Sequence, residues 1–174
     1  MRLWKIVMGF FFLCVMSLNA KEAAMFVESP AFANGGEIPA RYGCHGEDIS
    51  PPLVFGNIPE EARSLALVVE DPDAPSGLFV HWVLYDLPAT LRGLPEGVPP
   101  SPELEHGIRQ GRNDFGRIGY GGPCPPDRPH RYFFRLFALD RVPELPPGAT
   151  REQLLAAIRG HILAEADLMG IYPR

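Results

Sequence analysis

The middle of the chain carries two apolar runs separated by a loop rich in proline and glycine, and this arrangement restricts the fold most. The runs cover residues 65–69 and 80–84. Their length and β-branched content are typical of buried strands. Asp-Pro, Ala-Pro and Ser-Gly pairs mark residues 71–79 as a loop. Two carboxylates, Asp71 and Asp73, therefore follow one strand, and His81 with Trp82 enters the next. We expect this unit to bring Asp71 and His81 together, because a carboxylate can orient an imidazole and hold its charge.

Proline and glycine are frequent along the whole chain, with 20 prolines and 18 glycines in 174 residues. Because both residues interrupt long helices, their spacing between apolar runs favours short strands and ordered loops. The sequence predicts a single β-rich domain with a few helices over residues 21–174. Further strands are expected at residues 25–27, 53–55 and 132–140, and long loops at 88–107 and 107–120.

The end of the chain has the pattern of a helix from residue 150 to residue 170. Thr150 is a suitable N-cap, and Gln153 completes a capping box three positions later. Gly170 is a suitable C-terminal stop. The expected apolar face consists of Leu154, Leu155, Ile158, Ile162, Ala166 and Met169.

The first 20 residues have the pattern of a cleavable signal peptide. Arg2 and Lys5 provide positive charge, residues 6–18 are apolar and uncharged, and Asn19-Ala20 is a plausible cleavage end. The alternative is an uncleaved anchor, but the apolar run is shorter than the ~20 residues that a membrane span needs. The sequence therefore predicts an exported protein, periplasmic or secreted, without stable membrane insertion after cleavage.

The charge balance argues against two classes of partner. The formal net charge is −5, and cleavage after Ala20 removes two basic and no acidic residues, which leaves −7. A negatively charged protein without a basic stripe is poorly suited to bind nucleic acid or an anionic membrane surface nonspecifically.

Two cysteines, Cys44 and Cys124, lie in the expected mature chain, whereas Cys14 lies in the signal peptide. An even pair in an exported protein favours a disulfide. Two free thiols or two metal ligands are the alternatives. In the chain-entropy model, closing a loop of about 80 residues stabilises the fold by up to ~4 kcal/mol.

A second rigid stretch, residues 121–131, brings another histidine, His130, to the start of a strand. Two imidazoles, a carboxylate and inward-pointing backbone N–H groups can form a pocket for a small anion. Because proline has no N–H, Gly121, Gly122 and Cys124 are the expected backbone donors.

Each of these residues also has an ordinary structural explanation. Asp71 is consistent with a turn residue, since Asp-Pro is common in turns. His81 is consistent with a hydrogen-bonded core histidine beside Trp82. The second histidine at a strand start, His130, is what favours a site.

Three groups of residues in order carry a family resemblance. They are Asp71-Pro72-Asp73-Ala74-Pro75, His81-Trp82-Val83, and Gly119-Tyr120-Gly121-Gly122-Pro123-Cys124-Pro125-Pro126 with His130-Arg131-Tyr132. Together they resemble the phosphatidylethanolamine-binding protein family. Within it the chain is similar to the bacterial Raf kinase inhibitor-like branch, which Ser50-Pro51-Pro52-Leu53 and the run 110–116 also fit. The resemblance spans about residues 26–172.

The resemblance implies two packed antiparallel sheets, a few helices including one at the C-terminus, and a small preformed pocket for phosphate, sulfate, acetate or a phosphorylethanolamine head group. By motif position, the lining residues are Asp71, His81, Gly122, His130 and Tyr132. The residues expected close by are Pro72, Asp73, Trp82 and Pro126. A Cys44–Cys124 disulfide would brace the pocket loop. The connection from Pro126 to His130 is shorter than in eukaryotic relatives.

Binding is favoured over catalysis. Ser50 or Ser76 would have to join His81 and Asp71 in a nucleophilic triad, but no Gly-x-Ser-x-Gly motif is present. No short ligand spacing supports a metal site, and no cofactor is expected. The sequence thus predicts an exported binding protein, not an enzyme, for a small anion such as phosphate or a phospholipid head group. The alternative is an inhibitor or modulator of a protease, or of another enzyme, through its surface.

Overall fold

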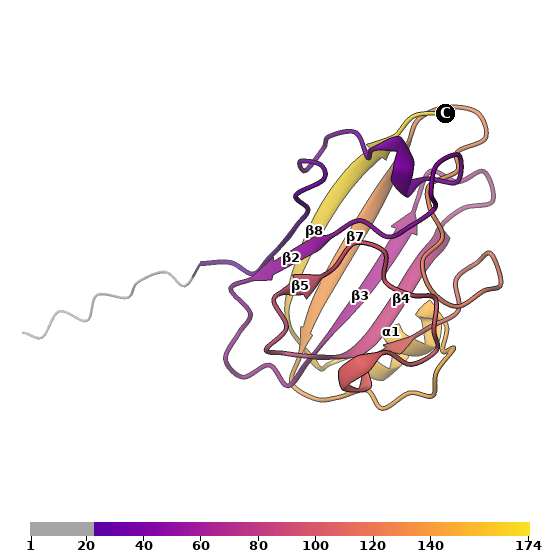
Figure 1. Cartoon of the computed structure of the whole chain (residues 1–174). Helices are drawn as coiled ribbons and strands as arrows, with labels where there is room; N and C mark the ends of the chain where they lie inside the picture. The colour runs from indigo at the N-terminus through magenta and orange to yellow at the C-terminus, as the bar shows by residue number, and fades with distance from the viewer. Residues whose placement is uncertain (1–22) are drawn as a thin grey trace, which may run out of the picture.

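The computed structural model describes residues 23–174, which form two antiparallel β-sheets and one α-helix (Figure 1). The larger sheet has the strand order β6-β4-β3-β7-β8 and the smaller sheet the order β1-β2-β5. The strands of the larger sheet are β3 (Ser64–Asp71), β4 (Phe79–Pro88), β6 (Arg109–Gln110), β7 (His130–Leu139) and β8 (Ile162–Tyr172). Those of the smaller sheet are β1 (Phe26–Glu28), β2 (Leu53–Gly56) and β5 (Gly93–Leu94). The helices are η1 (Ala40–Tyr42), η2 (Glu105–Gly107) and α1 (Arg151–Ile158). The predicted β-rich class with two packed antiparallel sheets is confirmed.

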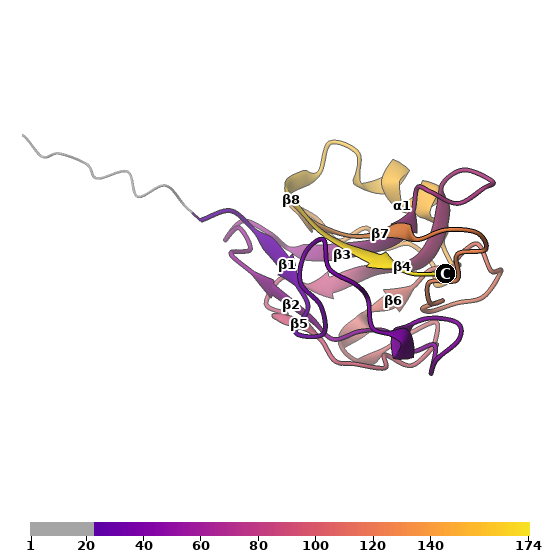
Figure 2. The same cartoon turned by 90° about the horizontal axis from the view of Figure 1, so that it is seen from above.

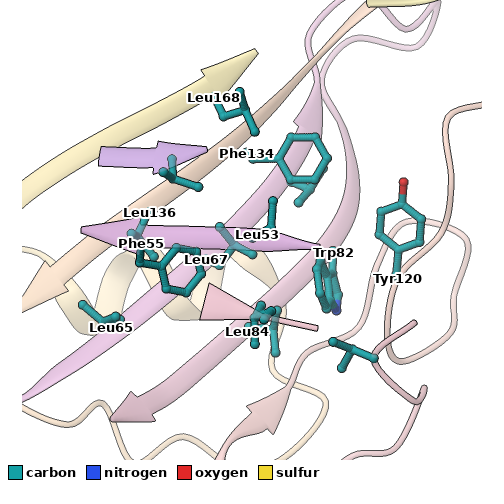
Figure 3. Packing of buried hydrophobic residues seen from close by; sticks show 14 of the residues in the cluster. Leu53, Phe55, Leu65, Leu67, Trp82, Leu84, Tyr120, Phe134, Leu136 and Leu168 are labelled. Carbon is teal, nitrogen blue, oxygen red and sulfur yellow. The ribbon is translucent and has the colours of Figure 1, made fainter. Parts of the chain in front are cut away.

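The core lies between the two sheets, and α1 covers the outer face of the larger one (Figure 2). Leu53 and Phe55 of β2 pack with Leu67 and Leu136 of the larger sheet (Figure 3). On the outer face, Ala66 and Val68 of β3 pack with Leu154 and Ile158 of α1. All eight residues of β3 are buried, because both faces of this strand are covered. This explains the continuous apolar run in the sequence.

The predicted helix at the end of the chain is correct at its start and wrong after Ile158. Thr150 and Gln153 form the expected capping box, and α1 ends at Ile158. Gly160 has a φ of +79°, which turns the chain back toward the sheet. The chain then forms β8, in which every second residue from residue 164 to residue 172 faces the core. Several apolar residues of this segment are also spaced as on one face of a helix, which is why the sequence predicted a helix here instead of a strand.

Two segments expected as loops are held by short pieces of regular structure. Residues 88–107 contain β5 and η2, and residues 107–120 contain β6, which pairs with β4. Buried Ser50 also holds this region, because its hydroxyl accepts a hydrogen bond from the backbone N–H of Val98 at 3.0 Å. These contacts order both segments.

The predicted signal peptide, residues 1–20, lies outside the described residues. From residue 23 to the end, no helix has the length and apolar character needed to cross a membrane.

Candidate functional site

Three strand ends converge at one end of the larger sheet. β3 lies between β4 and β7 and runs antiparallel to both, so its last residues lie beside the first residues of its neighbours. Asp71 ends β3, His81 lies near the start of β4, and His130 begins β7. All three residues are buried. The carboxylate of Asp71 accepts a hydrogen bond from His130 and not from His81, which corrects the pairing expected from the sequence.

A β-bulge in β4 directs His81 toward the inner side of the sheet. Two consecutive residues of β3 pair with Trp82 and Val80, so His81 is the extra residue between them. In a regular strand, His81 and Trp82 would point to opposite faces. Trp82 belongs to the inner core and Val80 to the outer one. The bulge lets the ring of His81 contact Tyr132 edge-on on the inner side, with the ring centroids 5.1 Å apart.

His81 has one ring nitrogen held by the backbone and one available to a ligand. Its Nδ1 lies 2.7 Å from the carbonyl oxygen of Gly121, which can only accept, so Nδ1 carries the proton. Burial lowers the pKa of His81 below its ordinary value of 6.5, despite the opposing effects of Gly121 and Asp71. The ring is therefore neutral at pH 7. Its Nε2 has no hydrogen-bond partner within residues 23–174 and is an acceptor.

His130 lies between two carboxylates. Its Nδ1 is 2.8 Å from Oδ2 of Asp71, and the side chains of this pair are 1% and 4% exposed. The other oxygen of Asp71 accepts a hydrogen bond from the backbone N–H of Asp73 at 2.8 Å. Nε2 of His130 is 3.3 Å from Oδ1 of Asp127, whose side chain is 60% exposed. Donation to both carboxylates at once requires a proton on each ring nitrogen.

These side chains line a cavity of ≈ 420 Å³. Its polar lining consists of Asp71, Ser76, His81, His130 and Tyr132. Its remaining lining consists of Ala74, Pro75, Phe79, Phe115, Cys124 and Pro126. The hydroxyl of Tyr132 is buried and has no hydrogen-bond partner among residues 23–174. Burial, and then the charge of Asp71, raise the pKa of Tyr132, so the phenol remains protonated and can donate. A buried donor without a partner is costly unless a ligand or water accepts from it.

The loop on one side of the cavity is tied to residues 42–48. The predicted disulfide between Cys44 and Cys124 is present, with the Cα atoms 5.4 Å apart. The N–H of Cys44 donates to the carbonyl of Pro123 at 3.0 Å, and the N–H of Gly122 donates to Asp48 at 2.6 Å. The disulfide therefore braces a loop that contributes Cys124 to the cavity lining.

Comparison with known proteins gives the same assignment. The profile described as "Phosphatidylethanolamine-binding protein" matches residues 28–173. The chain belongs to the phosphatidylethanolamine-binding protein family. It is 53% identical over 150 residues to a UPF0098 protein of Methanothermobacter thermautotrophicus, covering 86% of this chain and 99% of that protein.

Two solved structures are similar to this family member. The crystal structure of CT736 of Chlamydia trachomatis, a putative homologue of the family, has a TM-score of 0.81 and 47% identity, covering 87% of this chain and 98% of that one. YbcL of Escherichia coli, described as a new member of the mammalian family, has a TM-score of 0.77 and 32% identity, covering 87% and 99%.

The family resemblance implied a larger set of site residues than the cavity contains. Pro126 lines the cavity with the four side chains expected there, but Pro72 is exposed and lies outside the lining. The indole N–H of Trp82 donates to Gln110 at 2.7 Å, inside the core. Asp73 lies beside the cavity and is held by Arg131, whose guanidinium lowers the pKa of this carboxyl well below its usual range.

The expected nest of backbone donors is not formed by the glycines of this family member. The N–H of Gly121 donates to the carbonyl of His81, and the N–H of Gly122 donates to Asp48. A Cβ on Gly122 would lie 2.4 Å from the carbonyl oxygen of Tyr42, so this position supports the loop from behind. Of the three expected backbone donors, the two glycines therefore do not face the cavity, whereas Cys124 lines it.

Sequence reasoning missed the aromatic wall of the cavity. Phe79 and Phe115 meet edge-on with ring centroids 4.8 Å apart, and Phe115 also contacts His81. Phe79 could have been found, because it begins the strand that carries His81. Phe115 lies in a loop, so no periodic pattern in the sequence indicated its position. The carboxylate of the neighbouring Asp114 holds this loop beside β4, because it accepts a hydrogen bond from the backbone N–H of Val80.

One group of potential metal ligands occurs within residues 23–174, and it consists of Cys44, His45 and Cys124. Both sulfurs are joined in the disulfide, so neither is a thiolate able to ligate a metal.

Proposed function

We propose that this member of the phosphatidylethanolamine-binding protein family binds a small anion, such as phosphate or phosphorylethanolamine, in the cavity at the ends of β3, β4 and β7. The observation that carries the proposal is the convergence of three ligand-facing groups in one cavity. These groups are Nε2 of His81, the ring of His130 and the unpartnered hydroxyl of Tyr132. A phosphate group offers several acceptor oxygens to donors such as the ring of His130 and the hydroxyl of Tyr132.

Binding at His81 also sets a requirement on protons. Nδ1 must keep its proton to donate to the Gly121 carbonyl, so the ring cannot move that proton to Nε2. An anion can then accept from Nε2 only if the ring takes up a second proton or if the ligand brings a proton to Nε2. We therefore propose that anion binding is linked to proton uptake.

The proposed function is tested by an NMR titration with inorganic phosphate and with phosphorylethanolamine, following the imidazole signals. We expect the signals of His81 and His130 to shift together and to saturate, and His81→Ala to abolish saturation. His161 is the internal control, because it contacts Asp140 near the far end of β7 and lies outside the cavity. If neither cavity histidine responds at millimolar ligand, the proposal is wrong.

The pH dependence of binding gives a second prediction. The affinity for sulfate is expected to rise as pH falls toward the lowered pKa of His81, by up to about tenfold per pH unit, because the neutral ring of His81 must gain a proton. Sulfate is the suitable probe because its charge does not change in this range. In the absence of ligand, the stability of the fold depends on pH in the opposite direction. Because folding lowers the pKa of His81, the unfolded chain takes up this proton at a higher pH than the folded chain does, and the free energy of unfolding decreases as pH falls. Calorimetric titration at several pH values measures the first effect, and His81→Gln should flatten it.

We propose binding rather than catalysis. Ser76 lines the cavity, but within the described part of the chain it makes no hydrogen bond to His81 or His130. The inhibition of a protease through the surface is the alternative proposal, and it rests on the family alone. Inhibition of a secreted protease that survives His81→Ala, without anion binding by the parent chain, would favour it.

We also propose that the protein is exported. The proposal rests on the charged and apolar pattern of residues 1–20 and is supported by a disulfide, which persists in oxidising compartments. Sequencing the N-terminus of the protein purified from its native cells is the test. An N-terminus near residue 21 is expected, whereas a retained Met1 contradicts cleavage.

A further inference from the structure

Three potential metal ligands lie together at the disulfide. Cys44 and His45 belong to the segment 42–48, and Cys124 belongs to the loop that faces it. In the part of the chain that the structure describes, the two sulfurs and one ring nitrogen of His45 all lie within 4.8 Å of one another. His45 and Cys124 are exposed, and Cys44 is half-buried. A reductant and a metal ion therefore have access to this group from solvent.

The backbone holds the two cysteines together in addition to the covalent bond. The N–H of Cys44 donates to the carbonyl of Pro123 at 3.0 Å, so the two segments are joined directly beside Cys124. The Cα atoms of the two cysteines are 5.4 Å apart. Hydrogen bonds from Tyr120 and Gly122 join the same two segments. Both sulfurs therefore stay close together when the bond between them is broken.

We propose that reduction of the disulfide converts this group into a zinc site with Cys44, His45 and Cys124 as ligands. Zinc binds thiolate sulfur at ~2.3 Å and imidazole nitrogen at ~2.0 Å, which places tetrahedral ligand atoms about 3.5–3.8 Å apart. The three atoms already lie within 4.8 Å of one another, so rotations of these side chains reach that spacing. The inference does not depend on anion binding in the cavity.

The conversion is a two-electron reduction followed by metal binding. The reductant is a dithiol: one of its thiolates attacks a sulfur of the disulfide, and its second thiol resolves the mixed disulfide. The dithiol becomes a cyclic disulfide, and its two electrons and two protons leave two thiols on the protein. Zn²⁺ then binds both sulfurs as thiolates and releases the two thiol protons. Exchange with an oxidised dithiol reverses the sequence and expels the metal.

The carboxylates that follow His45 in the sequence are engaged elsewhere. Glu47 accepts a hydrogen bond from Arg41 at 3.1 Å. The two oxygens of Asp48 accept from Gly122 at 2.6 Å and from Arg117 at 2.9 Å. The protein therefore provides three ligands and leaves the fourth position to water, as in open zinc sites. Soft thiolates also favour Zn²⁺ over Mg²⁺ and Ca²⁺, which prefer oxygen ligands.

The test titrates Zn²⁺ into the full-length chain in its oxidised and reduced forms, in a Cys14→Ser background that leaves only the two cysteines of the site. A dithiol reduces the protein and is removed by gel filtration without oxygen. A parallel titration uses Co²⁺, whose absorption reports ligation by thiolates. His45→Ala removes the imidazole ligand. His161→Ala is the matched control, because His161 contacts Asp140 and is not part of the group.

We expect the reduced chain to bind one Zn²⁺ and the oxidised chain to bind it at least about a hundredfold more weakly. His45→Ala should weaken binding by the reduced chain at least about tenfold, whereas His161→Ala should leave it unchanged. The absorption of thiolate-bound Co²⁺ should appear only after reduction.

Three outcomes would overturn the proposal. Equal binding by the oxidised and reduced chains would show an adventitious ion only. Equal binding by the reduced parent and His45→Ala would show that the imidazole is not a ligand. Circular dichroism of the reduced chain without metal supplies the third readout: a folded chain that binds no Zn²⁺, or a chain that loses its fold on reduction, contradicts a site held together by the backbone.

Discussion

Asp71→Asn is expected to reduce the affinity for phosphate by at least about tenfold, while leaving the chain folded. The carboxylate accepts two hydrogen bonds, from Nδ1 of His130 and from the backbone N–H of Asp73, both at 2.8 Å. The two bonds go to different oxygens of the carboxylate, and an asparagine has an oxygen at only one of these positions, so it keeps only one of them. If its oxygen accepts from the backbone, its NH₂ group faces Nδ1, and His130 must give up that proton to accept from it. A ring that keeps this proton has no acceptor for it, so His130 loses the contact that orients it toward the cavity.

The same substitution should lower the free energy of unfolding by about 1–3 kcal/mol, the usual cost of weakening buried polar contacts. Chemical denaturation measures this loss, and the phosphate titration measures the loss of binding. The matched control is Asp73→Asn, which removes a carboxylate two residues away. Asp73 is paired with Arg131, whose side chain is 53% exposed, and it does not line the cavity. If Asp73→Asn weakens phosphate binding as much as Asp71→Asn, the role given to the pair of Asp71 and His130 is wrong.

The positions of the site histidines were predictable from the sequence because they follow from strand pairing. Apolar runs located β3, β4 and the start of β7, and residues at the joined ends of antiparallel strands must lie near one another. This reasoning brought Asp71 and His81 to one end of the sheet, whereas His130 was placed only at the start of a further strand, whose pairing with β3 the structure shows. It did not identify which imidazole binds the carboxylate, since both histidines lie on strands that pair with β3.

The finer features of the site depend on departures from regular structure. The bulge at His81 changes the face to which that side chain points, and the alternation of strand residues does not encode such an insertion. The contact from Asp127 to His130 spans three residues in an irregular connection without periodicity. Phe115 reaches the cavity through loop contacts. In β8, tertiary pairing with β7 prevailed over an apolar spacing that favoured a helix.

Removing the disulfide has the second large expected effect. Replacing both Cys44 and Cys124 with serine should lower the free energy of unfolding by about 2–4 kcal/mol. The two residues are separated by 80 positions, so the bond restricts a long loop in the unfolded chain. Denaturant unfolding of the full-length chain should be measured in a Cys14→Ser background, because Cys14 is a third thiol wherever residues 1–20 have not been cleaved. Reductant should destabilise the Cys14→Ser parent to the level of the double variant and have no effect on the latter.

The loss of phosphate affinity in the same double variant should be smaller, within about fivefold, because other contacts still hold the loop. The hydroxyl of Tyr120 donates to the carbonyl of Tyr42 at 3.0 Å, and the N–H of Gly122 donates to Asp48 at 2.6 Å. These hydrogen bonds join the same two segments as the disulfide, but they act only in the folded state. The disulfide therefore acts mainly on the unfolded chain, whereas the hydrogen bonds position the cavity wall. A complete loss of binding in a variant that remains folded would contradict this division and show that the covalent bond itself shapes the cavity.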